Sequence, residues 1–272
     1  MEEHEDSLIW VYGLCRKGEE YVPTVPDVEG TSNYTLVATS QVVALASQVP
    51  TQEYGQSAVQ QNIANNEWLV PRMVAYANVI ADTFENTLIM PWRFGTVFES
   101  DRRLLDVLQT HEPMLLQTLE KVRGTEEWGL KVFAHVDNRA AALVEDQLQT
   151  AMAQGMPPGR MHFIRRKLAP SMQAQAQAEL KAMALAMHQR IESCGYPAHV
   201  IGKNNNERLK TGEVLTFKAA YLVSKNSREP FFSLVDNLRR EYTHQNIVLV
   251  LTGPWAPYSF CDDVMPYLNG VD

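Results

Sequence analysis

Over residues 130–252 the spacing of apolar residues switches between two repeats in a fixed order, and this order constrains the fold more than any other feature of the chain. Apolar residues alternate or form short apolar runs over segments typical of strands, and they recur every three or four residues over segments typical of helices. These segments are 130–136, 180–191, 198–202, 215–223, 231–242 and 247–251. Their order predicts a ferredoxin-like βαββαβ arrangement with an extra helical segment in the first crossover.

The first part of the chain predicts a second unit of mixed strands and helices. An apolar run at 8–15 is typical of a buried strand, and the runs at 34–38 and 41–49 are expected to form a hairpin beside it. From Asn65 onward apolar residues recur at helical spacing, which predicts a helix with one face toward a core. The residues expected on that core face are Leu69, Met73, Tyr76, Ala77, Ile80 and Phe84.

Prolines and glycines divide the segment after this helix. Pro91 and Gly95 interrupt a short apolar run, so we expect a strand that leads into a constrained loop. Ser100 is a predicted helix cap. Pro113, a residue favoured in the first turn of a helix, marks the expected start of a further helix that ends at Gly124.

The domain bounds follow from these elements. A chain of 272 residues is near the size at which a single core stops growing, so two domains are expected. They are an N-terminal α+β domain at 1–125 and a C-terminal domain at 126–252 with a modified ferredoxin-like fold and extra helices. Residues 253–272 form an aromatic tail that we expect to pack back on the protein. The fold class is therefore α+β.

Charge and cysteine content restrict the partners and the compartment. A net charge of −8 opposes binding to nucleic acid or to an anionic membrane, and the basic cluster at 165–167 is expected to be a solvated helix face. Three scattered cysteines suit a reducing cytoplasm. The N-terminus is acidic where a secretory signal is basic, and the apolar run after it is too short to span a membrane. We expect a cytoplasmic protein with no membrane or nucleic-acid partner.

The sequence lacks the motifs that carry catalysis or hold cofactors. The histidines do not have the HExxH spacing of a metal site, and the cysteines do not have CxxC spacing. Residues 202–204 (GKN) resemble the end of a phosphate loop, but the upstream glycine is at the wrong distance and no Ser or Thr follows. Neither GxGxxG nor GxSxG occurs. We therefore expect no catalytic residues, no cofactor and no metal.

Two aromatic segments are not explained by composition alone. Residues 90–98 (MPWRFGTVF) and 252–260 (TGPWAPYSF) combine backbone-fixing prolines and glycines with large aromatic side chains. Such segments suit either a chain end folded onto its own core or a contact surface for a partner protein, and both interpretations stay open. The candidate protein-contact or domain-docking residues are Arg93, Phe94, Gly95, Pro254, Trp255, Tyr258 and Phe260.

Blocks along nearly the whole chain resemble the signature blocks of the gas-vesicle F/L proteins (GvpF/GvpL), in the same order. They are WVYGL at 10–14, PWRFGTVF at 91–98, AAYLVSK and FFSLVDNL within 219–238, and GPWAPYSF at 253–260. The resemblance implies a non-enzymatic gas vesicle assembly factor or minor structural component with a two-domain α+β fold. It also implies contact with the hydrophobic shell protein (GvpA type) and with other accessory proteins, and a gas-vesicle-associated, gas-facing position.

The chain departs from the family's pattern at three places. Tyr76 is near the position of a histidine in a His-Glu pair, Trp92 replaces an aliphatic residue, and Ala256 replaces the second of three prolines. These departures indicate a divergent paralogue and argue against a role for the His-Glu pair in this chain.

Two other functions stay open at this stage. Domains with a ferredoxin-like fold often bind small molecules, so a small-molecule-sensing regulatory module is the alternative, and saturable stabilisation by a ligand would favour it. An enzyme of unfamiliar type would require a pocket with convergent polar groups and titrating residues of shifted pKa.

Overall fold

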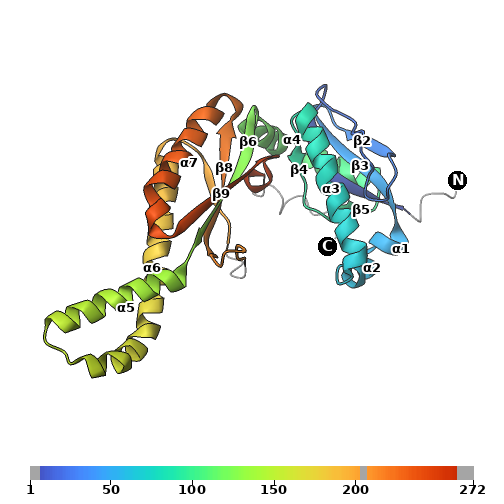
Figure 1. Ribbon diagram of the computed structural model, residues 1–272. Coiled ribbons are helices and arrows are strands. Elements are labelled where there is room, and N and C mark those ends of the chain that lie inside the picture. Colours follow the sequence, from blue (N-terminus) through green and yellow to red (C-terminus); the bar gives the residue numbers. More distant parts are fainter. Residues whose placement is uncertain (1–6, 203–206, 262–272) are drawn as a thin grey trace. The chain divides into compact units, whose positions relative to one another are not determined.

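The computed structural model describes residues 7–202 and 207–261 (Figure 1). The chain forms two compact units: unit 1 consists of Met1–Glu127 and Pro254–Asp272, and unit 2 consists of Trp128–Gly253. The chain enters unit 2 within strand β6 and returns within strand β9. Of the expected aromatic tail, residues 262–272 lie outside the described residues.

Unit 1 is built on an antiparallel sheet with β1 near its centre. Its strands are β1 (Ser7–Arg16), β2 (Tyr34–Ala38), β3 (Val42–Pro50), β4 (Met90–Pro91) and β5 (Val97–Phe98). The order is β2-β3-β1-β4, and β5 also pairs with β1. Strands β1 and β3 pair over their full length, with one bulge between Val11 and Gly13. The predicted first strand and the hairpin beside it are confirmed.

Helices cover both faces of this sheet. They are α1 (Thr51–Tyr54), α2 (Gln56–Asn62), α3 (Asn66–Asn86) and α4 (Asp101–Lys121). Figure 1 shows α3 in front of the strands and α4 behind them. The residues of β1 from Ile9 to Cys15 are consecutively buried, as expected for a strand that is covered on both sides. Gly13 is needed here, because a Cβ atom would lie 2.7 Å from the Ile89 side chain.

The prediction of a new helix at Pro113 is wrong, because α4 runs through this residue without a break. The predicted cap is confirmed: the Ser100 hydroxyl accepts a hydrogen bond from the Arg103 amide at 3.2 Å. The leucines of α4 form one continuous buried stripe on both sides of the proline, so burial outweighs the backbone hydrogen bond that proline cannot donate. These leucines are Leu104, Leu108, Leu115 and Leu119.

Unit 2 contains its elements in the predicted order. They are β6 (Thr125–Ala134), α5 (Val136–Ala153), α6 (Met161–Ser193), β7 (Ala198–Val200), β8 (Val214–Ser224), α7 (Arg228–Tyr242) and β9 (Ile247–Trp255). The sheet order is β7-β8-β6-β9. Alternate residues of β6 and β8 enter one core with the buried faces of α5, α6 and α7, as the alternation predicts. The strand residues in this core include Leu130, Val132, Ala134, Phe217, Ala219, Tyr221 and Val223.

Helices α5 and α6 form a long hairpin that reaches beyond the sheet of unit 2 (Figure 1). The segment between them contains Gly155, Pro157, Pro158 and Gly159. Gly155 has a φ of +86°, a conformation that suits glycine just after a helix. On α6 the residues of the unit 2 core begin at Ala176, so the preceding turns of this helix extend away from that core.

Candidate partner-binding surface

Residues 93–96 form a tight turn that is fixed to strand β1. The Thr96 amide and hydroxyl both donate to the Arg93 carbonyl, at 3.2 and 2.9 Å, and the Thr96 carbonyl accepts from the Val11 amide of β1 at 3.1 Å. Gly95 has a φ of +84°, which the third residue of a type II turn requires. The expected strand here is reduced to the two-residue strands β4 and β5. The turn is a well-anchored feature of unit 1.

Arg93 and Phe94 have opposite environments in this turn. The Phe94 ring makes edge-to-face contacts with Trp10 and Tyr76, with centroid separations of 5.1 and 5.5 Å. The Arg93 side chain is exposed. Phe94 therefore contributes to the aromatic core of unit 1, whereas Arg93 is accessible to a partner.

The chain after β9 packs into unit 1. Ala256 is buried in the same core cluster as Trp10 and Tyr76, and Tyr258 packs against that cluster. The Ser259 amide and hydroxyl donate to the buried Glu127 carboxylate at 2.7 and 2.9 Å. Burial raises the pKa of Tyr258 above its usual range, so the phenol is neutral. This segment is internal to unit 1.

The candidate residues therefore fall into two groups. Phe94 and Tyr258 meet at one aromatic cluster, Phe260 is buried, and Gly95 shapes the turn. Arg93, Pro254 and Trp255 are exposed, and the Trp255 side chain keeps 51% of its surface in solvent. Only this second group is available for contact with another protein.

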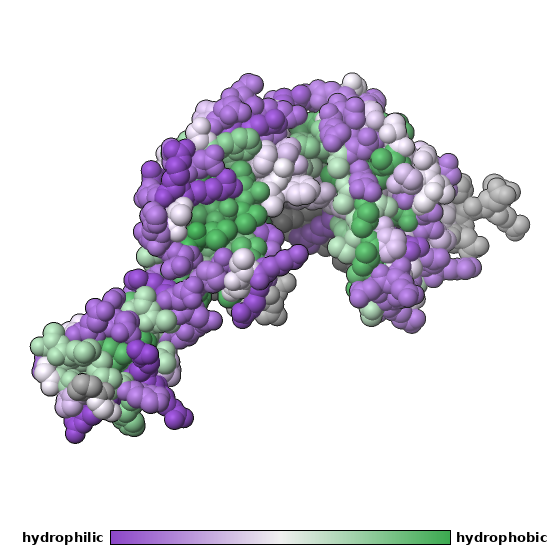
Figure 2. Space-filling view, in the orientation of Figure 1, coloured by the Kyte–Doolittle hydropathy of each residue, from purple (hydrophilic) through white to green (hydrophobic). Residues whose placement is uncertain are grey.

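The outer face of α3 carries several exposed apolar side chains in one row. Val70, Met73 and Val74 are 51%, 49% and 54% exposed, and Ala77 and Ala81 continue the stripe at helical spacing. We call these five residues the α3 stripe. Figure 2 shows hydrophobic residues gathered over this helix. Contiguous exposed apolar surface of this kind is a candidate binding site for a protein or other apolar partner.

The prediction for this helix is wrong at Met73 and Ala77. Their spacing assigns both residues to the core, but both are exposed. The buried residues of α3 are Tyr76, Val79, Ile80 and Thr83. The helix is apolar around most of its circumference, so two stripes at helical spacing overlap in the sequence. The Tyr76 hydroxyl, which donates to the Trp92 carbonyl, fixes which stripe faces inward. The second stripe was visible in the sequence at 70–81, but nothing there shows which of the two faces solvent.

A polar network holds α3 in place near the N-terminal end of the stripe. The Arg72 guanidinium contacts Glu53 at 2.8 Å and Glu29 at 3.2 Å, and lies 4.4 Å from the centroid of the Trp68 ring. The Arg72 Nε also donates to the hydroxyl of buried Tyr54 at 2.5 Å. A planar guanidinium with several partners is well suited to such a junction. The network links α3 to α1 and to the loop before β2.

A family model described as "Gas vesicle synthesis protein GvpL/GvpF" matches residues 8–262. The chain belongs to this family. Among its relatives, gas vesicle protein L of Streptomyces sp. (strain CB03234) is 27% identical over 256 residues, which cover 94% of this chain and 93% of the relative. Gas vesicle protein F2 of Halobacterium salinarum is 23% identical over 259 residues, with the same coverage. The resemblance of the sequence blocks to the F/L family is thereby confirmed.

Solved GvpF structures share the fold of this family member. The crystal structure of GvpF from Anabaena sp. PCC7120 matches with a TM-score of 0.65 at 13% identity, over 94% of this chain and 96% of that one. GvpF from Microcystis aeruginosa matches with a TM-score of 0.62 at 14% identity, over 93% and 98%. At these identities the likeness concerns the fold alone, a mixture of helices and sheets.

Two buried titratable residues of the described part of this family member, Cys15 and His188, lie within packed regions. Burial raises the pKa of the Cys15 thiol to about 12, so this cysteine is not an activated nucleophile. The buried His188 hydrogen-bonds the Tyr221 hydroxyl at 2.9 Å. Within residues 7–202 and 207–261, no three His, Cys, Asp or Glu side chains group to hold a metal ion. No helix of these ranges is both long and apolar enough to cross a membrane.

Proposed function

We propose that this protein is a non-enzymatic gas vesicle assembly factor that binds the hydrophobic shell protein, of the GvpA type, through the α3 stripe. Membership of the GvpL/GvpF family gives the chain an accessory role in gas vesicle synthesis. The observation that carries the finer proposal is the row of exposed apolar side chains at positions 70, 73 and 74.

A gas-filled wall needs a subunit with extensive apolar surface, and such surface aggregates unless another protein covers it before assembly. The α3 stripe offers apolar contact at the spacing of one helix face, which suits packing against an apolar helix or a hydrophobic segment of a partner. The Arg72 network and the buried face of α3 hold this surface in place before binding. A surface held in this way loses little conformational entropy when it binds.

We further infer that unit 2 is a modified ferredoxin-like fold. The support is its element order, strand, helices, strand, strand, helix, strand, together with β6 and β8 at the centre of the sheet and β7 and β9 at its edges. The α5–α6 hairpin is the extra helical part of the first crossover. This fold by itself assigns no chemistry.

Under this proposal the protein acts in the cytoplasm in association with gas vesicles, and its exposed apolar face fits a gas-facing position. Arg93, Pro254 and Trp255 are additional contact candidates because they are exposed. Other accessory proteins of the vesicle are candidate partners for these residues.

The test is co-purification of the tagged full chain with co-expressed shell protein. The variant Met73→Gln/Val74→Gln removes the centre of the stripe but keeps helix-forming side chains. The matched control, Val22→Gln/Val200→Gln, changes two valines of similar exposure, 50% and 52%, outside α3. We expect the α3 variant to retain about tenfold less shell protein than wild type, a loss of ~1.4 kcal/mol, while the control retains it fully.

Two results would contradict this proposal. One is equal retention of shell protein by the α3 variant and the control. The other is a loss of retention together with a large drop in melting temperature, because substitutions on an exposed helix face change stability by only about 0.5 kcal/mol. Thermal unfolding of both variants is therefore measured beside the co-purification.

A further inference from the structure

The two units carry opposite net charge. Unit 2 contains 16 Lys and Arg against 10 Asp and Glu, which gives a net charge of +6. The remainder of the chain contains 8 against 22, which gives −14. The total of −8 conceals this difference. Seven of the 22 acidic residues lie in 1–6 and 262–272, outside the described residues, and the rest of unit 1 is still net negative. Opposite net charges on the two units favour association between copies, with unit 2 of one copy facing unit 1 of another.

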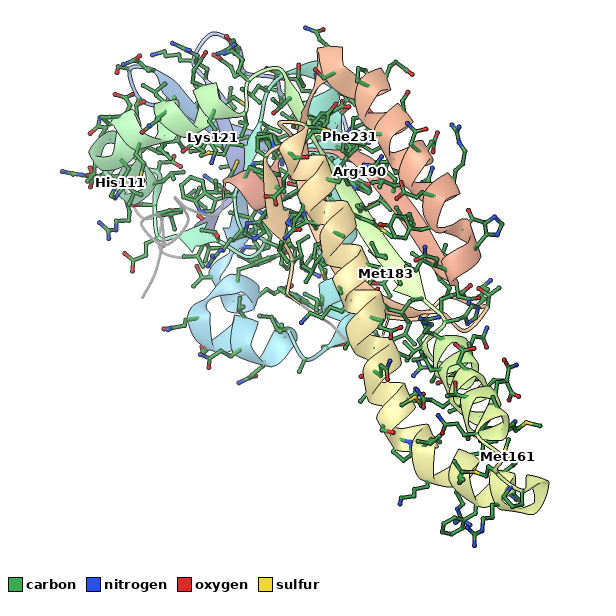
Figure 3. All side chains as sticks on the ribbon, turned by 90° about the vertical axis from the view of Figure 1, so that its left-hand side faces the viewer. His111, Lys121, Met161, Met183, Arg190 and Phe231 are labelled. Atoms are coloured by element: carbon green, nitrogen blue, oxygen red, sulfur yellow. The ribbon has the colours of Figure 1, made fainter. Side chains whose placement is uncertain are left out.

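The end of the α5–α6 hairpin is an exposed surface with apolar and basic residues side by side. We call residues 152–167 the hairpin tip. Its Phe163 side chain is 74% exposed and its Met152 side chain is 54% exposed. Figure 3 shows Met161 at this end of the hairpin, away from the sheet, and shows Met183 of the same helix closer to the sheet. Exposed Phe and Met side chains are typical of protein-binding surfaces.

The charge at the hairpin tip is of one sign. Residues 147–178 contain the cations Arg160, Arg165, Arg166 and Lys167 and no Asp or Glu. Arg166 and Lys167 follow Phe163 by three and four residues, so they share its face of α6. Arg165 is paired with Glu145 of α5 at 2.7 Å. The face around Phe163 thus has an apolar centre and a basic edge, and it fits an apolar surface with an acidic edge.

The α3 stripe has that complementary character. Glu67 lies three residues before Val70, and Glu85 lies four residues after Ala81, so both carboxylates border the stripe on the same helix. Both glutamates are exposed. Arg72, the cation of this helix, is held by Glu29 and Glu53. The outer face of α3 is therefore apolar in the middle and has one carboxylate near each end.

We propose that copies of this chain associate head to tail, with the hairpin tip of one copy bound to the α3 stripe of the next. Phe163 and Met152 contact the valines and Met73 of the stripe, and Arg166 and Lys167 face Glu67, the carboxylate that lies next to Val70 on the same helix. Two different surfaces form this contact, so it is heterologous and extends into chains or closes into rings. This inference goes beyond the proposed function, but it involves the same α3 stripe. A bound copy would therefore cover the stripe until shell protein displaces it.

The first measurement is the mass of the purified full chain by sedimentation velocity over a range of protein concentration and salt. We expect the average mass to rise with protein concentration and to fall as salt screens the charge pairs. The tip variant, Phe163→Gln/Arg166→Glu/Lys167→Glu, is expected to be monomeric. The control Lys181→Glu/Arg240→Glu makes the same change in net charge at exposed positions elsewhere in unit 2 and is expected to associate like wild type.

A mixing experiment tests the head-to-tail geometry. The stripe variant, Val74→Gln/Glu67→Gln/Glu85→Gln, is also expected to be monomeric alone, and its neutral side chains offer no charge partner to the altered tip of the tip variant. In a mixture, its intact hairpin tip binds the intact stripe of the tip variant, so a one-to-one dimer that grows no further is expected. A mixture that stays monomeric overturns the proposal, as does a wild-type chain that is monomeric at every concentration, or a tip variant that associates as wild type does.

Shell-protein capture separates this proposal from the proposed function. The tip variant has an intact stripe, so it is expected to retain co-expressed shell protein while it fails to self-associate. Loss of self-association with shell capture intact supports the head-to-tail contact. If the tip variant self-associates as wild type does, the head-to-tail proposal is wrong. The proposed contact with the shell protein is then judged by its own co-purification test.

Discussion

In the turn at 93–96, one side chain packs against the core of unit 1 and the adjacent side chain is exposed to solvent. Phe94 is held by ring contacts with Trp10 and Tyr76, and edge-to-face aromatic pairs stabilise a protein beyond the area that they bury. Arg93, one residue earlier, is exposed. The anchored turn keeps the two residues in these different environments, so their substitutions should have different effects.

We predict that Phe94→Ala lowers the free energy of unfolding by about 2 to 3 kcal/mol, because it removes two ring contacts and leaves a cavity beside Trp10. Arg93→Ala, the matched change at the adjacent exposed position, should alter stability by no more than about 0.5 kcal/mol. Urea denaturation of both variants measures the difference. Equal stabilities would show that Phe94 is not part of the core in solution.

Glu112 of α4 gives a prediction about pH. Its carboxylate accepts hydrogen bonds from the Thr39 hydroxyl, from the Ser40 hydroxyl at 2.9 Å and from the Gln41 amide at 2.9 Å, at the turn between β2 and β3. These bonds, the one from Thr39 foremost, lower the pKa of Glu112 below its ordinary value of 4.5. The folded state thus favours the charged form. Its contribution to stability is full above pH 4.5 and is lost as the pH falls through the lowered pKa.

The prediction is that Glu112→Gln is less stable than wild type at neutral pH and that the gap closes in acid, below the ordinary pKa of the carboxyl group. Denaturation midpoints of both proteins over a pH series provide the measurement. Glu85→Gln, at an exposed position of α3, is the control. A gap that does not change with pH would mean that the charge of Glu112 does not stabilise the turn.

At the scale of elements, helix α4 shows how tertiary burial overrides a local signal. Proline is favoured in the first turn of a helix, so Pro113 predicts a helix start. The helix nevertheless begins at Asp101, because Ser100 caps it there and its leucines line one buried face. The proline is exposed in mid-helix, where it removes a backbone hydrogen bond and crowds the preceding turn. The helix tolerates this cost, and a substitution should recover part of it.

Pro113→Ala is therefore expected to stabilise the protein by about 1 to 3 kcal/mol, because alanine restores the missing amide donor and favours the helix. Gln117→Ala, at another exposed position of α4, should change stability by less than about 0.5 kcal/mol. Melting temperatures of the two variants and wild type give the comparison. A lower melting temperature for Pro113→Ala would show that the proline itself contributes to packing.

Periodicity predicted the existence of the long elements but not their orientation. The strands at 8–15 and 215–223 and the helix from Asn65 were foreseen because each has a strong repeat. The outward face of α3 could not be predicted, because Met73 and Tyr76 both fit the helical repeat and only the packing of Tyr76 in the core distinguishes them. The short strands β4 and β5 exist through pairing with β1, which local sequence does not reveal.

At the scale of the whole molecule, unit 2 is an insertion within unit 1. Unit 1 needs residues from both ends of the chain, since Ala256 and Tyr258 complete the cluster around Trp10 and Tyr76. The two points of insertion are near each other, because β6 and β9 are neighbours in one sheet and the Thr252 hydroxyl donates to the Gly129 carbonyl at 3.3 Å. The sequence predicts two successive domains followed by a tail, because contacts between residues far apart in the chain leave no local sequence pattern.

This topology predicts that residues 1–127 alone are less stable than residues 1–127 joined to 254–272 by a short Gly/Ser linker of about four residues, a typical length for a tight connection. The isolated segment loses the Ser259–Glu127 hydrogen bonds and leaves Glu127 and the aromatic cluster partly uncovered. We expect a difference of at least about 3 kcal/mol, the cost of removing a large buried side chain. Denaturation of the two shortened chains measures it, with Glu127→Ala in the joined chain as the control for the hydrogen bonds alone. Equal stability of the two would mean that the C-terminal segment is not docked in unit 1, and Tyr258 and Phe260 would then be available, like Trp255, to bind a partner.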